Sequence, residues 1–177
     1  MLDTGLHALH DQVTLIPQEP ELFNSTVEDN ITMDIKVDSH DLERVIGLAQ
    51  FQSVLDRLPD GLQTNVMEKG VSLSGGEKQR LALARGLLAG WSSDFIFMDE
   101  PTSSVDFINE TKIYENVLSE FENKTIISTV HNLSLLKYFD EIYLFNKGKV
   151  VTYGSFEKIK EDSIFKKLWD KYNKSLA

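Results

Sequence analysis

The sequence of 177 residues contains no cysteine, no long apolar run and no excess of positive charge. Without cysteine, neither a disulfide framework nor a thiolate metal site can form, which fits a cytosolic location. No apolar stretch approaches the ~18 residues that suggest a membrane-spanning helix. The first residues, MLDTGLHALHDQ, lack the basic and apolar segments of a signal peptide. We therefore expect any link to a membrane to come through another segment or another chain.

Basic residues are outnumbered, with 18 Lys and Arg against 28 Asp and Glu, for a formal net charge of −10. Such an acidic surface argues against nucleic acid as a partner, because phosphate backbones are bound by clustered positive charge. It leaves nucleotide binding open, because backbone N–H groups can bind a phosphate locally. With 41% hydrophobic residues, the chain is long enough for one globular domain with its own core.

Segments with strand-like and helix-like patterns alternate along the chain. The predicted strands are residues 12–16, 95–98 and 125–130, and the predicted helices are within 41–58, 76–89 and 107–121. The run 95–98 is unbroken and apolar, so we expect it to be covered on both faces, and we expect 125–130 to be buried as well. This alternation predicts an α/β fold with a largely parallel sheet.

The last part of the chain has a different pattern. Residues 133–138 predict a short helix, 141–145 and 150–153 a hairpin, and 163–172 an amphipathic helix. The sequence contains no internal repeat, low-complexity segment or linker. We therefore predict a single domain over residues 1–177.

A glycine pair precedes the helix predicted from residue 76. The sequence from Leu73 to Glu77 is LSGGE. Gly75 and Gly76 let a phosphate approach the backbone closely, and the helix N-terminus offers N–H groups and positive dipole. Ser74 can cap the helix or turn its hydroxyl to a phosphate. Taken alone, Ser74 and Glu77 form an ordinary capping box, which would be the preferred interpretation without further motifs.

Two adjacent carboxylates, Asp99 and Glu100, follow the apolar run 95–98. At the end of a buried strand such a pair is costly unless it meets a cation or a reactive water. Asp99 can hold Mg²⁺ through its water shell. Glu100 can orient and deprotonate a water for attack on a phosphoryl group. The alternative is a solvated acidic pair at a strand end, which the upstream Ser-Gly-Gly makes the less favoured interpretation.

Together these motifs resemble the ATP-binding-cassette (ABC) ATPase family from about His10 to Gly154. Residues 73–77 match the signature motif, 95–100 match Walker B with the catalytic glutamate, and 103–106 match the D-loop. The strand-end residues Gln18 and His131 match the Q-loop glutamine and the switch histidine. The resemblance implies the following site residues: catalytic Glu100 and His131; ATP-binding Gln18, Ser74, Gly75, Gly76, Glu77 and Asp106; and Asp99 with Gln18 for Mg²⁺, through water.

The resemblance also implies a fold and partners. The fold is the P-loop NTPase-like ABC ATPase fold, a mainly parallel sheet flanked by helices, with a helical signature subdomain at 31–92 and a core at 1–30 and 93–177. Residues 18–31 and 64–70 resemble the Q-loop region and X-loop of exporters. This implies ATP and Mg²⁺ as cofactors, an exporter transmembrane domain and a second, head-to-tail nucleotide-binding domain as partners, and a place at the cytoplasmic face of the membrane.

One part of the family pattern is missing, because no GxxxxGK followed by Ser or Thr occurs in the sequence. Gly148-Lys149 is followed by Val150 and predicts a hairpin turn. Without that loop these residues lack the cradle for the β- and γ-phosphates, so we expect the isolated chain not to hydrolyse ATP. Truncation is the simplest interpretation. Milder departures are Glu77, where glutamine is commoner, and Thr129-Val130 before His131.

Three functions are compatible with these motifs to different degrees. The first is an ATP-binding and ATP-hydrolysing subunit or domain of an exporter, coupling hydrolysis to transport. The alternative is a non-hydrolysing partner that supplies its signature motif in trans to an intact cassette. A soluble ABC protein of DNA maintenance or translation is disfavoured by the X-loop-like stretch and the acidic surface.

Overall fold

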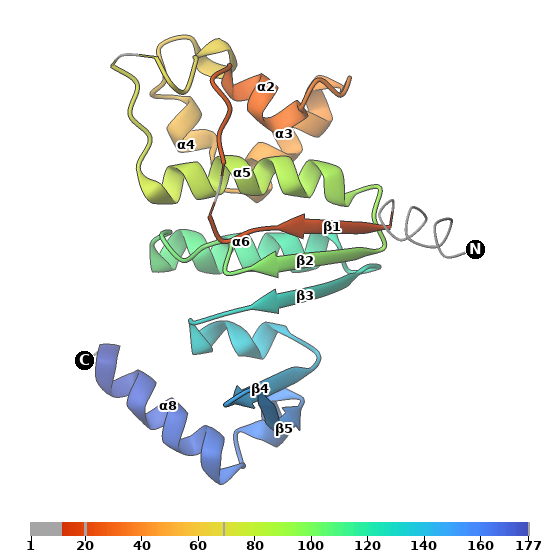
Figure 1. Ribbon diagram of the computed structural model, residues 1–177, viewed down its shortest axis with the longest axis vertical. Coiled ribbons are helices and arrows are strands. Elements are labelled where there is room, and N and C mark those ends of the chain that lie inside the picture. Colours follow the sequence, from red (N-terminus) through yellow and green to blue (C-terminus); the bar gives the residue numbers. More distant parts are fainter. Residues whose placement is uncertain (1–11, 20, 69, 177) are drawn as a thin grey trace. The chain divides into compact units, whose positions relative to one another are not determined.

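The computed structural model describes residues 12–19, 21–68 and 70–176, with side chains up to residue 174 (Figure 1). The chain forms two compact units, Met1–Thr129 and Val130–Ala177. Among the described residues, no helix has both the length and the apolar character that crossing a membrane requires.

The first unit contains a three-stranded parallel sheet in the order β1-β2-β3 (Figure 1), which confirms the predicted α/β class. Its strands are β1 (Val13–Ile16), β2 (Phe95–Asp99) and β3 (Thr125–Thr129). Its helices are α2 (Val27–Thr32), α3 (Ser39–Leu48), α4 (Gln52–Leu55), the 3₁₀ helix η1 (Gly61–Gln63), α5 (Gly75–Gly90) and α6 (Phe107–Glu120). Sequence patterns predicted all three strands and the helices α3 to α6, but not α2.

The sheet is buried on one face only. Alternate side chains point to one face, where Ile96 and Met98 are at most 3% exposed. Helix α5 lies against this face so closely that a Cβ on Gly86 would be 2.5 Å from Ile16. Helix α6 covers the same face, because the hydroxyl of Tyr114 hydrogen-bonds Ser128, the neighbour of Met98 in register.

On the opposite face, Leu15 is 65% exposed and Ile127 is 50% exposed. Phe95 on the same face is 38% exposed. The expectation that residues 95–98 are covered on both faces, and 125–130 buried, is therefore wrong. An apolar strand is covered twice only where helices pack on both faces of its sheet, and α5 and α6 pack on the same one.

Helix α5 forms the centre of the first unit. Leu81, Leu83, Ala84 and Leu87 are all completely buried. Its surroundings are α2, α3 and β1. Ser74 caps its first turn, so the helix predicted from local sequence is present with nearly the expected bounds.

A buried polar network joins α5 to the segment before α2. The Arg85 guanidinium donates to the backbone oxygens of Asn30 (2.6 Å) and Glu21 (2.9 Å) and to Asn30 Oδ1 (3.0 Å). It also lies 4.9 Å from the ring centre of Phe23. Asn30 itself is fully buried and exchanges hydrogen bonds with the Phe23 backbone. Burial lowers the pKa of Arg85.

Removing this network should cost stability. Arg85→Ala removes the three hydrogen bonds that the guanidinium donates to Asn30 and Glu21, so we expect the free energy of unfolding to fall by about 1–3 kcal/mol. The control is Arg57→Ala, which removes an ion pair between Glu77 and a side chain that is 48% exposed. Such a pair is worth less than about 1 kcal/mol. Urea unfolding curves should separate the two variants, and equal losses would contradict the assignment of Arg85.

The second unit begins with the 3₁₀ helix η2 (Leu133–Tyr138). It continues with the antiparallel hairpin β4 (Ile142–Asn146) and β5 (Lys149–Gly154), then α7 (Phe156–Ile159) and α8 (Ser163–Leu176). Its core contains Leu136, Ile142, Ile159 and Phe165. Lys147 and Gly148 have φ of 49° and 75°, the left-handed backbone that a two-residue hairpin turn requires. Gly148-Lys149 therefore belongs to a hairpin, as predicted.

Candidate functional site

Four polar side chains meet at the carboxyl edge of the parallel sheet. Asp99 ends the central strand β2 and Glu100 follows it, Gln18 lies two residues after β1, and Thr129 ends β3. Parallel strands bring such residues to one edge. The Gln18 side-chain amide donates to Glu100 Oε2 at 2.8 Å. The structure thus brings together Gln18, Asp99 and Glu100, three residues that the sequence predicted as site members.

Thr129 joins this group without having been predicted. Its hydroxyl donates to Asp99 Oδ1 (2.8 Å) and accepts from the Glu100 backbone N–H (2.9 Å). Glu100 has φ of 45°, in the left-handed region. In the sequence, Thr129 was notable only as an unusual residue before His131. Its position at the end of the strand next to Asp99 was the signal that could have identified it.

The start of α5 is a capping box. The Ser74 hydroxyl accepts from the Glu77 backbone N–H (3.3 Å), and Glu77 Oε2 accepts from the Ser74 N–H (2.7 Å). Arg57 forms an ion pair with the other Glu77 oxygen. Burial by itself raises the pKa of Glu77, but hydrogen bonds from Ser74 and Arg57 outweigh it and lower the pKa overall. Both Glu77 oxygens are thus used within the chain, and nucleotide contacts by Ser74 and Glu77 stay predictions.

Gly76 lies against the loop that precedes α6. A Cβ on Gly76 would lie 2.4 Å from the backbone oxygen of Ser104, closer than any side chain can approach. A Cβ on Gly75 would meet the Ser104 side chain at 3.5 Å, an ordinary contact. Only glycine at position 76 therefore permits this approach of helix and loop.

Gln79, which was not among the predicted site residues, connects three segments of the site. It is 6% exposed. Its amide nitrogen donates to the Gln18 backbone oxygen (3.0 Å) and Ser103 Oγ (2.8 Å), and its oxygen accepts from the Ser104 N–H (2.7 Å). The first turns of α5, the segment after β1 and the loop 103–106 are thereby held together. A polar cavity of about 330 Å³ at this junction is lined by Gln18, Glu19, Gly75, Lys78, Gln79, Ser103 and Ser104.

The two remaining predicted residues have different positions. Asp106 is the N-cap of α6, and hydrogen bonds from the side chain and backbone of Asn109 lower its pKa. His131 lies in the second unit, between β3 and η2, so the geometry of the first unit does not include it. The residue after it, Asn132, accepts from the Ser134 N–H (3.0 Å) and the Tyr172 hydroxyl (2.6 Å), which joins this segment to α8.

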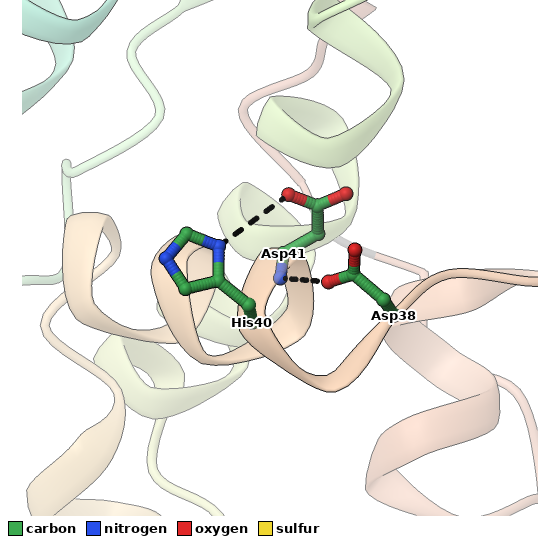
Figure 2. A group of neighbouring side chains, drawn as sticks. All are labelled: Asp38, His40 and Asp41. Carbon is green, nitrogen blue, oxygen red and sulfur yellow. Dashed lines mark hydrogen bonds and ion pairs between the residues drawn. The ribbon is translucent and has the colours of Figure 1, made fainter.

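Two further polar clusters lie on α3. In the first, one ligand atom from each of Asp38, His40 and Asp41 falls within 4.8 Å of the others (Figure 2). Asp38 is the N-cap of α3 and accepts from the Asp41 N–H at 2.8 Å, while the His40 side chain is 78% exposed. We therefore interpret this cluster as the exposed, capped N-terminus of α3.

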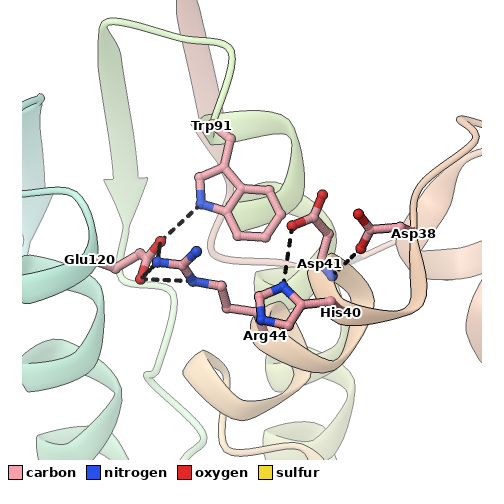
Figure 3. A network of polar contacts seen from close by, with 6 residues as sticks. All are labelled: Asp38, His40, Asp41, Arg44, Trp91 and Glu120. Atoms are coloured by element: carbon pink, nitrogen blue, oxygen red, sulfur yellow. Dashed lines mark hydrogen bonds and ion pairs between the residues drawn. The ribbon is translucent and has the colours of Figure 1, made fainter.

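In the second cluster, Arg44 and the Trp91 indole N–H both donate to Glu120 (Figure 3). The Arg44–Glu120 distances include one of 2.8 Å, and the indole bond is 3.2 Å. This contact joins α3 to the ends of α5 and α6, and we interpret it as structural.

Residues 1–103, more than half of the chain, match the family model described as ABC transporter. The chain belongs to the ABC transporter family. This confirms the resemblance first seen in residues 73–77 and 95–100. The parallel sheet with α5 and α6 on one face is accordingly part of an ABC nucleotide-binding domain.

Similar proteins include a transporter and a flippase. The chain is 38% identical over 173 residues to the "Iron-sulfur clusters transporter ATM1, mitochondrial" of Candida albicans. That match covers 94% of this chain and 23% of the relative. It is 36% identical over 157 residues to the "ATP-dependent lipid A-core flippase" of Haemophilus ducreyi. That match covers 87% of this chain and 26% of the relative. The chain thus spans about a quarter of the length of these relatives.

A solved structure supports the fold. The structure of a bacterial Atm1-family ABC exporter with ATP bound has a TM-score of 0.79 and 30% sequence identity to this chain. The match covers 96% of this chain and 29% of that one. The fold predicted from the motifs, an ABC ATPase fold with a mainly parallel sheet flanked by helices, is therefore confirmed.

Proposed function

We propose that this chain is the part of an exporter nucleotide-binding domain that handles Mg²⁺ and the attacking water during ATP hydrolysis. The observation that carries the proposal is the group at the sheet edge. Gln18, which follows β1, contacts Glu100, and Thr129, which ends β3, contacts Asp99, both at the end of the central strand. The membership of the chain in a transporter family supports coupling of this reaction to transport.

The donor set fits Mg²⁺. Carboxylate and amide oxygens are the ligands that Mg²⁺ prefers, usually with several waters retained. Asp99 would hold the ion, with Gln18 contributing through water. When bound, Mg²⁺ neutralises charge on the transferred phosphate. Glu100 would orient the attacking water and accept its proton, and the Gln18 amide at 2.8 Å keeps its carboxylate at the sheet edge.

The other predicted residues would act on ATP bound between two nucleotide-binding domains. Ser74, Gly75, Gly76, Glu77 and Asp106 would contact ATP held by a second nucleotide-binding domain in a head-to-tail pair. His131 would contact the γ-phosphate late in the reaction. The phosphate-binding loop is not among the 177 residues and would be supplied from outside them. A transmembrane domain, fused or separate, would be the further partner, with the chain at the cytoplasmic face of the membrane.

The proposal is tested by comparing the isolated chain with the full-length polypeptide that carries it. We expect no turnover and weak Mg-ATP binding by the isolated chain, because it lacks the phosphate cradle. The full-length protein should hydrolyse ATP, and Asp99→Asn should weaken the Mg²⁺ dependence of nucleotide binding. Turnover by the purified isolated chain that Glu100→Gln abolishes would contradict the expectation.

An alternative role follows from the same residues. The signature sequence 73–77 would also suit a non-hydrolysing partner that completes the site of an intact cassette in trans. A full-length protein that never hydrolyses ATP, yet binds an ATP-loaded intact cassette better than an ADP-loaded one, would support this role instead.

A further inference from the structure

We propose that Thr129 is a positioning residue for ATP hydrolysis, whose hydroxyl fixes the Asp99 carboxylate and the Glu100 backbone in one arrangement. The inference rests on the proposed function, in which those two residues handle Mg²⁺ and the attacking water. Thr129 is distinct from them because it acts through them and need not touch a substrate.

The Thr129 hydroxyl acts both as a hydrogen-bond donor and as a hydrogen-bond acceptor. A threonine hydroxyl offers one donor and can also accept. Here it donates to Asp99 Oδ1 at 2.8 Å and accepts from the Glu100 N–H at 2.9 Å. Because Oδ1 receives this bond, the orientation of the Asp99 carboxyl plane is restricted. One side chain therefore orients the proposed metal ligand and the backbone of the proposed base together.

The backbone at Glu100 depends on such support. Its φ of 45° lies in the left-handed region, which a residue with a side chain adopts only where its surroundings fix it. Thr129 fixes the Glu100 N–H from the β3 side, and Gln18 fixes the Glu100 carboxylate from the β1 side at 2.8 Å. The base is thus held between the two outer strands of the sheet.

The sheet explains why this position can do so. Thr129 is the direct partner of Asp99 in the parallel register of β2 and β3. A β-branched side chain in a strand has few χ1 rotamers, so its hydroxyl stays directed at its partners. Valine has nearly the same shape without the hydroxyl, and serine keeps the hydroxyl without the methyl group. Substitutions at position 129 can therefore separate the effect of the hydroxyl from the effect of side-chain shape.

The experiment compares Thr129→Val, Thr129→Ser and Thr125→Val in the full-length protein. Thr125 is the matched control, because it is exposed on the same strand at the opposite end from Asp99. Hydrogen bonds to charged groups are worth roughly one to two powers of ten in an equilibrium constant. We expect Thr129→Val to lower kcat about 10–100-fold with the KM for ATP little changed. Thr129→Ser should retain most activity, and Thr125→Val should match the parent protein.

A second measurement does not depend on turnover. In the Glu100→Gln background, we expect Thr129→Val to raise the Mg²⁺ concentration needed for half-maximal nucleotide trapping several-fold, with nucleotide binding in the absence of Mg²⁺ unchanged. Thr129→Ser and Thr125→Val should leave that concentration unchanged. Thr129→Ala removes the same hydroxyl and replaces the valine variant if that variant does not fold.

Unchanged kcat and unchanged Mg²⁺ dependence in Thr129→Val would overturn the inference. Equal losses in the valine and serine variants would also overturn it, because they would assign the effect to packing. These results are distinguishable from failure of the proposed function. In that case, Glu100→Gln and Asp99→Asn themselves would leave hydrolysis and Mg²⁺ dependence unchanged.

Discussion

Glu100→Gln is expected to lower kcat for ATP hydrolysis in the full-length protein by roughly 10²–10⁴-fold, because an amide cannot accept the proton of the attacking water. Nucleotide binding should survive. The substituted side chain keeps its size and an oxygen that can accept from the Gln18 amide, which now donates to Glu100 at 2.8 Å. Steady-state turnover and equilibrium nucleotide binding, measured on the same preparation, separate these two effects.

The control for this variant is Glu122→Gln, which makes the same chemical change at an exposed carboxylate in the turn between α6 and β3. It should hydrolyse ATP at the parent rate. Near-normal turnover in Glu100→Gln would contradict the prediction and show that another group acts as the base. Loss of nucleotide binding together with turnover would instead indicate that Glu100 is needed to form the site.

Gly76→Ala is expected to have the second large effect, on stability and on pairing of nucleotide-binding domains. The new Cβ would lie 2.4 Å from the backbone oxygen of Ser104, so either α5 or the loop 103–106 must move. Forced overpacking of this kind costs about 1–3 kcal/mol. Because Gln79 joins the same loop to the Gln18 backbone, the displacement should also reach the segment after β1. We expect ATP-dependent association of two domains to be lost.

Gly75→Ala supplies a closely matched control. It adds the same methyl group one residue earlier in the same helix, where the Cβ would meet Ser104 at an ordinary 3.5 Å. We expect its free energy of unfolding, from urea curves, to stay within about 1 kcal/mol of the parent protein. Equal destabilisation by the two substitutions would show that the close approach to Ser104 does not determine the effect of Gly76→Ala.

Local patterns in the sequence predicted most elements because each depends on nearby residues. The apolar spacing of α5, the Ser74 and Glu77 capping box and the turn at Gly148 all act within a few residues. Helix α2 was missed although Thr26 and Asp29 form a capping box of the same kind. That helix has six residues, too few for a clear periodic pattern.

For the candidate site, the sequence by itself determined the family and the residues at the strand ends. Asp99 and Glu100 were predicted from an acidic pair after an apolar strand, and Gln18 from its match to the family motif. The roles proposed for Asp106 and His131 came from motif order, and they stay predictions.

Only the tertiary structure decided which groups position those residues. Thr129 contacts Asp99 across 30 positions of sequence, Gln79 contacts Gln18 across 61, and Arg85 contacts Glu21 across 64. It also decided that one face of β2 is covered and the other exposed. Such contacts have no periodic or local signature, because they depend on which elements pack together and at what distance. Sequence patterns therefore identified the chemistry of the site, and packing determined its geometry.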